Sequence, residues 1–249
     1  RAGASPLTSG GVTAPVTYSS YLRVPELLSL QQEPRAHDEL LFVVLHQSHE
    51  LWFKLVLHEL DEVTRLIERD RFPEAETRLR RIVAIMRQLT AQWDVLGTMT
   101  PAGYLEFRHV LEGGSGFQSA QFRELEFASG LKDPSYLASR WLSDEERGRL
   151  QRRLDAPTLA DAFADALARH GVTDVLDVLR AGPSMITLLC ESLIDYDEAV
   201  GHWRHRHVLA VERQIGLKPG TGGSTGAAYL RSTLTRRFFP DLWEARTRL

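Results

Sequence analysis

The clearest structural signal lies in residues 73–97, which read PEAETRLRRIVAIMRQLTAQWDVLG. Apolar side chains recur here at steps of one, three or four residues and form a wide stripe on one helix face: Leu79, Ile82, Val83, Met86, Leu89, Trp93 and Leu96. Pro73 stands where the first turn of a helix tolerates proline, and Gly97 stands where a helix commonly ends. The stretch therefore predicts a long helix with one buried face.

The same helical period continues on both sides of this stretch. A second long helix is expected from about His37 to about Ile67, with Asp38 and Glu39 in the first turn, where the helix dipole favours acidic side chains. A third is expected from about residue 184 to about residue 216, between a Gly-Pro pair and a glycine. Three long helices of this kind predict a bundle.

Shorter helices complete the prediction. Ser143 and Thr158 each have an acidic residue three positions later, as in an N-terminal capping box, so a helix is expected to follow each of them. A final helix is expected over residues 229–248, with a break at Pro240. Because alternating strand patterns are nearly absent, the sequence predicts an all-α fold, a single-domain helical bundle.

The chain divides by composition into an arm and a domain. Residues 1–16 are expected to form a flexible N-terminal arm, since they begin with a Gly-, Ser- and Ala-rich stretch that lacks the apolar core of a signal peptide. Residues 17–249 are expected to form the helical domain. Within it, the polar region of about residues 129–169 predicts a small helical insertion.

The composition excludes several classes of partner. The 249 residues include 30 Lys+Arg and 33 Asp+Glu, and the net charge of −3 argues against a nucleic-acid or anionic-membrane partner. No uninterrupted apolar run approaches the roughly 20 residues that cross a bilayer. The single cysteine, Cys190, excludes an internal disulfide and a thiolate zinc site. We expect a cytoplasmic protein without nucleic-acid or membrane partners.

Two histidines lie on one face of the second helix. Phe42, His46, His49 and Phe53 follow one another at steps of four, three and four residues. Histidines one turn apart are able to ligate a metal, but the zinc-protease pattern is absent and no third ligand follows. The spacing favours the other interpretation, in which each histidine is a hydrogen-bonded core or subunit-interface residue.

His207 lies on an otherwise apolar face of the third helix. It follows Tyr196, Val200 and Trp203 at helical spacing. A neutral imidazole on such a face is typical of a hydrogen-bonded core residue. It is also what a haem iron requires, namely one axial imidazole and an apolar wall. The spacing leaves both interpretations open.

Two further features are suited to a small polar ligand. Tyr104 and Arg108 are four residues apart, so a helix presents a phenol and a guanidinium together, a pair that suits a carboxylate. The segment Gly216–Gly226 holds five glycines and Thr221, and its amides are able to close over a ligand. It matches neither a phosphate-binding loop nor a dinucleotide-binding fingerprint. The alternative for Arg108 is a surface arginine whose side chain lies over Tyr104. The alternative for the glycine-rich segment is a plain connector between helices.

Ten short motifs are spread from near the N-terminus to the last predicted helix. They are TYSSYL (17–22), HDELLFVVLHQSHELWFK (37–54), MTP (99–101), FR (107–108), SGFQS (115–119), QFR (121–123), WRHRH (203–207), VER (211–213), GTGGS (220–224) and YLR (229–231). In these motifs and in their order, the chain resembles the tryptophan 2,3-dioxygenase family. The members of this family are haem enzymes that open the indole ring of L-tryptophan.

The resemblance implies a fold, a cofactor and a reaction. It implies an all-helical homotetramer that encloses haem b (iron protoporphyrin IX) and uses O2 as co-substrate. The implied reaction opens the indole C2–C3 bond of L-tryptophan, or of a closely related indole amino acid, to give N-formylkynurenine. The implied partner is therefore a small molecule.

The resemblance also implies roles near the iron. His207 matches the axial histidine of the haem iron, and Trp93 matches an aromatic residue that lines the haem. His46 matches the distal histidine, which contacts the indole nitrogen, and Phe42 matches a wall of the indole pocket.

The substrate's amino-acid end is implied to meet a second group of residues. Arg108 matches the clamp on the substrate carboxylate, with Tyr104 beside it, and Thr221 matches a threonine at the ammonium and carboxylate end. The N-terminal motif matches a segment that completes the pocket of a neighbouring subunit through Tyr18, Tyr21 and Leu22.

Five positions depart from the family pattern. Ser19 replaces a usual glycine, His49 a usual tyrosine, Gly103 a common acidic residue, and Gly113-Gly114 a proline with a small residue. These differences leave an alternative open, the haem-dependent mono-oxygenation of a β-substituted tryptophan to an oxindole-type product. A non-enzymatic haem sensor or carrier is a further alternative, although such a protein has no use for a carboxylate clamp.

Overall fold

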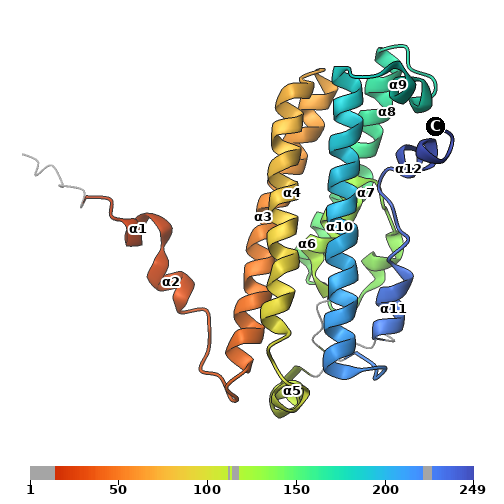
Figure 1. The fold of residues 1–249 in the computed structure, drawn as a ribbon. Coiled ribbons are helices and arrows are strands. Elements are labelled where there is room, and N and C mark those ends of the chain that lie inside the picture. Colours follow the sequence, from red (N-terminus) through yellow and green to blue (C-terminus); the bar gives the residue numbers. More distant parts are fainter. Residues whose placement is uncertain (1–14, 112, 114–117, 221–225) are drawn as a thin grey trace, which may run out of the picture.

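Three long helices form the body of the molecule, and α3 runs antiparallel to the other two (Figure 1). They are α3 (Glu39–Glu68), α4 (Phe72–Leu96) and α10 (Met185–Ile215), and α4 packs against the other two. All three long helices that the sequence predicts are therefore confirmed. The structure is a computed structural model and describes residues 15–111, 113, 118–220 and 226–249.

The short helices begin where local capping chemistry starts them. Ser143 caps α7 (Asp144–Asp155) and Thr158 caps α8 (Leu159–Arg169), each through a reciprocal capping box with the acidic residue three positions later. Both predicted helix starts are confirmed. In the described residues there is no β-strand, so the all-α prediction is confirmed as well.

The C-terminal region differs from its prediction. Two helices, α11 (Ala227–Ser232) and α12 (Pro240–Thr247), replace the single expected helix, and Pro240 opens α12. Proline is tolerated there because an N–H in the first helical turn has no partner within the helix. Residues 233–239 form a linker between these helices, and at its end the buried carboxylate of Asp197 accepts hydrogen bonds from the N–H groups of Phe238 and Phe239.

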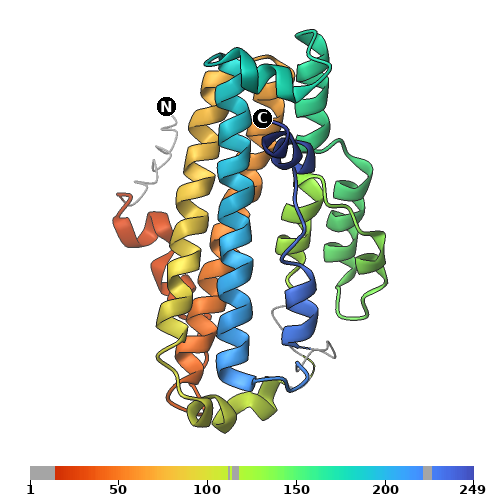
Figure 2. The same ribbon diagram turned by 45° about the vertical axis from the view of Figure 1, so that its right-hand side comes forward.

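The remaining helices cover the bundle. The helix α6 (Ala120–Ser129) packs on α3, as does α8, and α7 packs on α6. The helix α9 (Val175–Ala181) lies beside α12, and a 3-10 helix, η3 (Pro134–Ala138), precedes α7 (Figure 2). At the other end, α5 (Pro101–Arg108) and the 3-10 helix η1 (His109–Leu111) follow α4 across the base of the bundle (Figure 1).

An arm projects from one side of the bundle. It consists of α1 (Tyr18–Leu22) and α2 (Val24–Leu28), and Figure 1 shows it standing away from α3. The chain returns to the bundle where the Gln31 amide donates to Gln47 at 2.5 Å. The expected division into a flexible arm and a domain starting at residue 17 stays a prediction, because residues 1–14 lie outside the described part.

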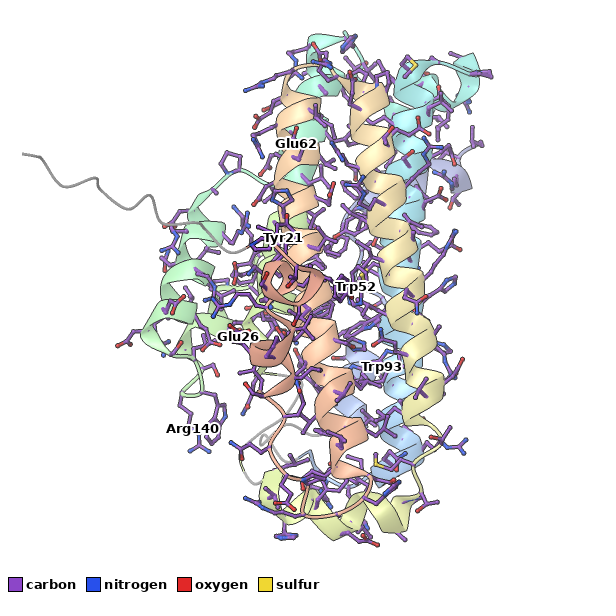
Figure 3. The ribbon with its side chains drawn as sticks, turned by 90° about the vertical axis from the view of Figure 1, so that its left-hand side faces the viewer. Tyr21, Glu26, Trp52, Glu62, Trp93 and Arg140 are labelled. Atoms are coloured by element: carbon purple, nitrogen blue, oxygen red, sulfur yellow. The ribbon has the colours of Figure 1, made fainter. Side chains whose placement is uncertain are left out.

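One face of α3 combines apolar composition with exposure. The helix is, among the described residues, the one long and apolar enough by composition to span a membrane. It nevertheless serves the bundle as a core helix, with residues such as Val56, Leu60 and Val63 fully or almost fully buried. Its exposed apolar side chains are Leu40, Val44, Leu51 and Trp52. Figure 3 views the molecule from the side of the arm and labels Tyr21 and Trp52.

Candidate active site

The first half of α3 positions a phenylalanine and a histidine. Phe42 and His46 are one turn apart, and their ring centroids are separated by 4.1 Å. The Nδ1 of His46 lies 2.7 Å from the Phe42 carbonyl oxygen. Because a carbonyl only accepts hydrogen bonds, Nδ1 carries the proton and Nε2 keeps its lone pair. Burial lowers the pKa of His46, although the Phe42 carbonyl and Glu50 partly oppose the shift. His46 is thus a neutral hydrogen-bond acceptor.

The short helix α5 adds an aromatic wall and a cation. Phe107 and Tyr104 lie 5.6 Å and 6.2 Å from the Phe42 ring. Thr100 caps this helix by accepting from the Gly103 N–H, which fixes where α5 starts. The Arg108 guanidinium lies near the Tyr104 hydroxyl, where its charge opposes the rise in pKa that burial gives this phenol, and Arg108 donates to the Pro219 carbonyl at 2.9 Å. A guanidinium therefore stands beside the aromatic wall.

On the other side of the site, α10 presents His207 among aromatic rings. Trp93 of α4, labelled in Figure 3, stacks on His207 at 4.8 Å with an angle of 14° between the rings. Trp203 lies one turn before His207, at 5.3 Å. Burial lowers the pKa of His207 to about 3, so the imidazole is neutral. Its ring nitrogens have no hydrogen-bond partner in the part of the chain that the structure describes.

These groups meet at one end of the bundle. The chain reverses direction between α3 and α4, so the start of α3 lies beside the ends of α4 and α10 (Figure 1). Trp93 connects the two histidines, since its ring is 6.5 Å from His46 and 4.8 Å from His207. A cavity of about 510 Å³ borders Phe42 and His46 on the side of α6.

The donor set around His207 fits a haem. Haem iron takes a neutral imidazole, apolar walls and few other groups from the protein. His207 supplies an unbonded neutral imidazole, and Trp93 and Trp203 supply the walls. Both indole Nε1–H groups are buried donors without a partner among the described residues. Buried donors in this condition indicate a partner that the protein itself does not supply, such as a bound group or a water.

His49 is a core residue of the same region. It is 4% exposed, its Nδ1 lies 2.9 Å from the Leu45 carbonyl oxygen, and its ring is 4.9 Å from Trp93. Burial lowers its pKa to about 4. No cluster of three metal-binding side chains occurs in the described residues. Of the two interpretations of the His46–His49 pair, the structure favours hydrogen-bonded side chains over a two-histidine metal site.

Comparison with known proteins decides the family. The family model described as tryptophan 2,3-dioxygenase matches residues 7–172 and 178–249. The chain belongs to the tryptophan 2,3-dioxygenase family. The resemblance read from the motifs is confirmed, and so is the expectation of an oxidoreductase enzyme of this family.

Relatives of this family cover nearly the whole chain. A tryptophan 2,3-dioxygenase of Herpetosiphon aurantiacus is 46% identical and covers 94% of this chain and 98% of its own. A tryptophan 2,3-dioxygenase of a Nocardioides species is also 46% identical, and the match covers 95% of this chain and 96% of the relative. One of Caulobacter vibrioides is 43% identical, and the match covers 94% of this chain and 98% of the relative. These names favour dioxygenation and give no support to the mono-oxygenase alternative.

The structure brings together six of the residues that resemblance to tryptophan 2,3-dioxygenases singled out in the bundle. Phe42, His46, Trp93 and His207 form one aromatic group, and Tyr104 adjoins it through Phe42. Arg108 joins through Tyr104. Thr221 lies outside the described residues.

The N-terminal residues of the expected site lie elsewhere. Tyr18, Tyr21 and Leu22 are 79%, 77% and 47% exposed on the projecting arm. They contribute nothing to the site of their own chain, as the family resemblance implied. Their place in the site of a neighbouring subunit stays a prediction.

Sequence reasoning missed two members of the aromatic group. Phe107 lies against Phe42, and Trp203 lies 4.7 Å from the Phe122 ring. The sequence pattern does contain a signal that could have placed Trp203 in the site, because this residue precedes His207 by one helical turn. Phe107 had only its place in the Phe-Arg pair of the tryptophan 2,3-dioxygenase motif.

Proposed function

We propose that this chain is a haem-dependent dioxygenase that converts L-tryptophan and O2 into N-formylkynurenine. The indole C2–C3 bond breaks, each of its carbons gains one oxygen atom, and no other reductant is consumed. The observation that carries the proposal is the pair of neutral histidines, His46 and His207, on either flank of Trp93 beside the Arg108 guanidinium.

The two histidines have different tasks in the proposal. His207 would hold haem b through its iron, since its ring nitrogens are unbonded among the described residues and burial keeps it neutral. When bound, the haem supplies the ferrous iron at which O2 is activated. His46 does not bind iron in this proposal. Its Nε2 accepts the indole N–H, because Nδ1 is occupied by the Phe42 carbonyl.

The remaining residues orient the substrate. Phe42 and Phe107 form the wall against which the indole packs, which keeps water from the reacting bond. Arg108 binds the substrate carboxylate through two parallel N–H donors, with the Tyr104 hydroxyl beside it. Thr221 binds the ammonium and carboxylate end of the substrate. It is two positions along the chain from Pro219, whose carbonyl accepts a hydrogen bond from Arg108.

We further propose a homotetramer whose arms complete neighbouring sites. The arm carries Tyr18, Tyr21 and Leu22 on a short helix without a buried residue. Exposed apolar side chains on α3, such as Leu51 and Trp52, offer surface for contact between subunits. A cytoplasmic location remains a prediction.

The test is product analysis with labelled dioxygen. The ferrous, haem-loaded protein is mixed anaerobically with L-tryptophan, then exposed to 18O2, and the product mass is measured. We expect N-formylkynurenine with two labelled atoms. A product with one labelled atom would favour mono-oxygenation, and a protein that binds no haem would refute the proposal.

His207→Ala is the matched variant for the cofactor. We expect the Soret band to be lost or displaced while the helical content, measured by circular dichroism, stays unchanged. A Soret band identical to that of the unaltered protein would show that another residue holds the iron.

A further inference from the structure

A second, smaller cavity borders His207. It measures about 30 Å³ and shares no lining residue with the larger cavity beside His46. His207, Trp203 and Arg204 reach it from α10, Glu126 from α6, and Thr233 from the end of α11. The charged and polar groups around this space are therefore one carboxylate, two guanidinium groups (those of Arg123 and Arg204) and the imidazole proposed to hold the iron.

The polar groups around this cavity are incompletely satisfied. Glu126 is 1% exposed and accepts from Arg204 Nη2 at 2.8 Å and from Arg123 Nη1 at 2.5 Å. Each carboxylate oxygen has two lone pairs, so Glu126 is able to accept further hydrogen bonds. The Nε–H of Arg204 and the Nε1–H of Trp203 are buried donors with no partner among the described residues.

The size and the lining of the cavity suit one water molecule. A water in the liquid occupies about 30 Å³, and a buried water typically makes about three hydrogen bonds to polar groups that otherwise lack partners. A water at this place would be able to accept an N–H from His207 and from an unpartnered donor, and to donate to Glu126. An apolar occupant would leave the same donors unsatisfied.

We propose that one water in this cavity links the His207 ring to the Glu126 carboxylate, which makes Glu126 the positioning residue of the axial imidazole. The inference rests on the proposed function, since it takes His207 as the ligand of the haem iron. An axial imidazole binds iron through one ring nitrogen and donates the N–H of the other. A carboxylate at the end of that hydrogen bond draws the proton away, strengthens the iron–nitrogen bond and stabilises ferric over ferrous iron.

The same helix provides a matched control. Glu124 is two residues before Glu126 and is 5% exposed, but its carboxylate accepts from Arg149 of α7 at 2.8 Å. It does not line the cavity beside His207. Glu124→Gln therefore removes an equally buried charge from α6 without touching the proposed link.

The experiment compares Glu126→Gln, Thr233→Leu and Glu124→Gln as haem-loaded proteins. The readouts are the iron–histidine stretching frequency of the ferrous form, by resonance Raman, and the ferric/ferrous reduction potential. Glu126→Gln removes the charge, whereas Thr233→Leu keeps every charge and fills the cavity with apolar atoms. We expect both to lower the stretching frequency. The ferrous-to-ferric ratio should rise at least tenfold, which is about 59 mV for one electron.

Each outcome bears on the proposal. A Glu124→Gln protein that behaves like the unaltered one supports it, provided the other two variants shift. An unmoved stretching frequency in Thr233→Leu would overturn the water link, and this variant decides the question if Glu126→Gln does not fold. A changed potential with an unmoved frequency in Glu126→Gln would show a through-space charge effect instead. Failure of the unaltered protein to bind haem would contradict the proposed function itself.

Discussion

At the residue scale, His46 owes its chemistry to a backbone hydrogen bond and to burial. The Phe42 carbonyl holds the proton on Nδ1, and burial lowers the pKa of the ring below the ordinary value for histidine. The titratable groups around it are Glu50 and His49 on the same helix and His207 on α10. Both neighbouring histidines are also neutral, with pKa values of about 4 and about 3.

The pH dependence follows from the direction of this shift. A histidine with a lowered pKa stays neutral until the pH falls through that lowered value, so His46 keeps its acceptor nitrogen at pH values where an ordinary histidine is already protonated. We expect kcat/KM for L-tryptophan to change little as the pH falls from 8 through the ordinary histidine range and to fall only in more acidic solution. A half-maximal value near the ordinary histidine pKa, about 6.5, would contradict the buried environment described for His46.

Arg108 gives a second test at the residue scale. Arg108→Ala removes the charge-assisted hydrogen bonds to the substrate carboxylate, which contribute about 1.5–3 kcal/mol, so we expect KM for L-tryptophan to rise at least roughly tenfold. Tryptamine lacks the carboxylate and serves as the matched substrate. Its KM should be nearly equal in the two proteins. An unchanged KM for L-tryptophan would show that another group holds the carboxylate.

At the scale of helices, the cap of α8 determines how firmly this helix is held on α3. The Thr158 side chain accepts from the Asp161 N–H at 3.1 Å and donates to the Asp161 carboxylate at 2.7 Å. Thr158 is 4% exposed, so no solvent molecule easily replaces these bonds. The same capping box at Ser143 is exposed and starts a more polar helix, α7.

Thr158→Ala should therefore lower the free energy of unfolding by about 1 kcal/mol at pH 7, and more than Ser143→Ala does. The hydrogen bonds from Thr158 lower the pKa of Asp161, so their stabilisation is present above the unfolded pKa and is lost as pH falls through the folded one. The difference between Thr158→Ala and the unaltered protein should shrink in acid. Urea unfolding of both proteins at pH 7 and at a pH below the folded pKa of Asp161 measures this difference. A loss of unfolding free energy that is equal at the two pH values would exclude the Asp161 contribution.

The helices also show why some elements follow from sequence and others do not. The period of Leu79, Ile82 and Met86 and the boxes at Ser143 and Thr158 are local signals, so the long helices and the starts of α7 and α8 were predicted correctly. The linker before α12 depends on Asp197, which is more than 40 residues from Phe238 and lies on another helix. No local pattern contains that contact.

The candidate site also combines features that local sequence patterns predict with features that depend on residues far apart in the chain. The spacing of Phe42 and His46 indicates that they share a helix face, which the structure confirms. The stacking of Trp93 on His207 and the bond from Arg108 to Pro219 each join residues more than 100 positions apart. Spacing alone left His207 open between a core residue and an iron ligand, and it left Arg108 open between a carboxylate clamp and a surface arginine; family resemblance favoured one interpretation of each.

At the scale of the whole molecule, the arm and the site lie apart within one chain. Tyr21 is 77% exposed on the arm, whereas Arg108 and His46 lie at the end of the bundle. Closed symmetric assembly offers a way to use both, because each arm then meets the same surface of a neighbouring subunit. A test must therefore separate a defect of the arm from a defect of the pocket.

Subunit mixing makes this separation. Tyr21→Ala impairs the arm and leaves the pocket of its own chain intact, while Arg108→Ala impairs the pocket and leaves the arm intact. Each variant alone should show low activity. After co-expression, random assembly gives an intact pocket facing an intact arm at about one site in four, so about a quarter of the unaltered activity should return at low substrate concentration. The control is an assembly in which every subunit carries Arg108→Ala. If the arm instead folded back on its own chain, an intact arm and an intact pocket would never meet in the mixture, and no activity would return.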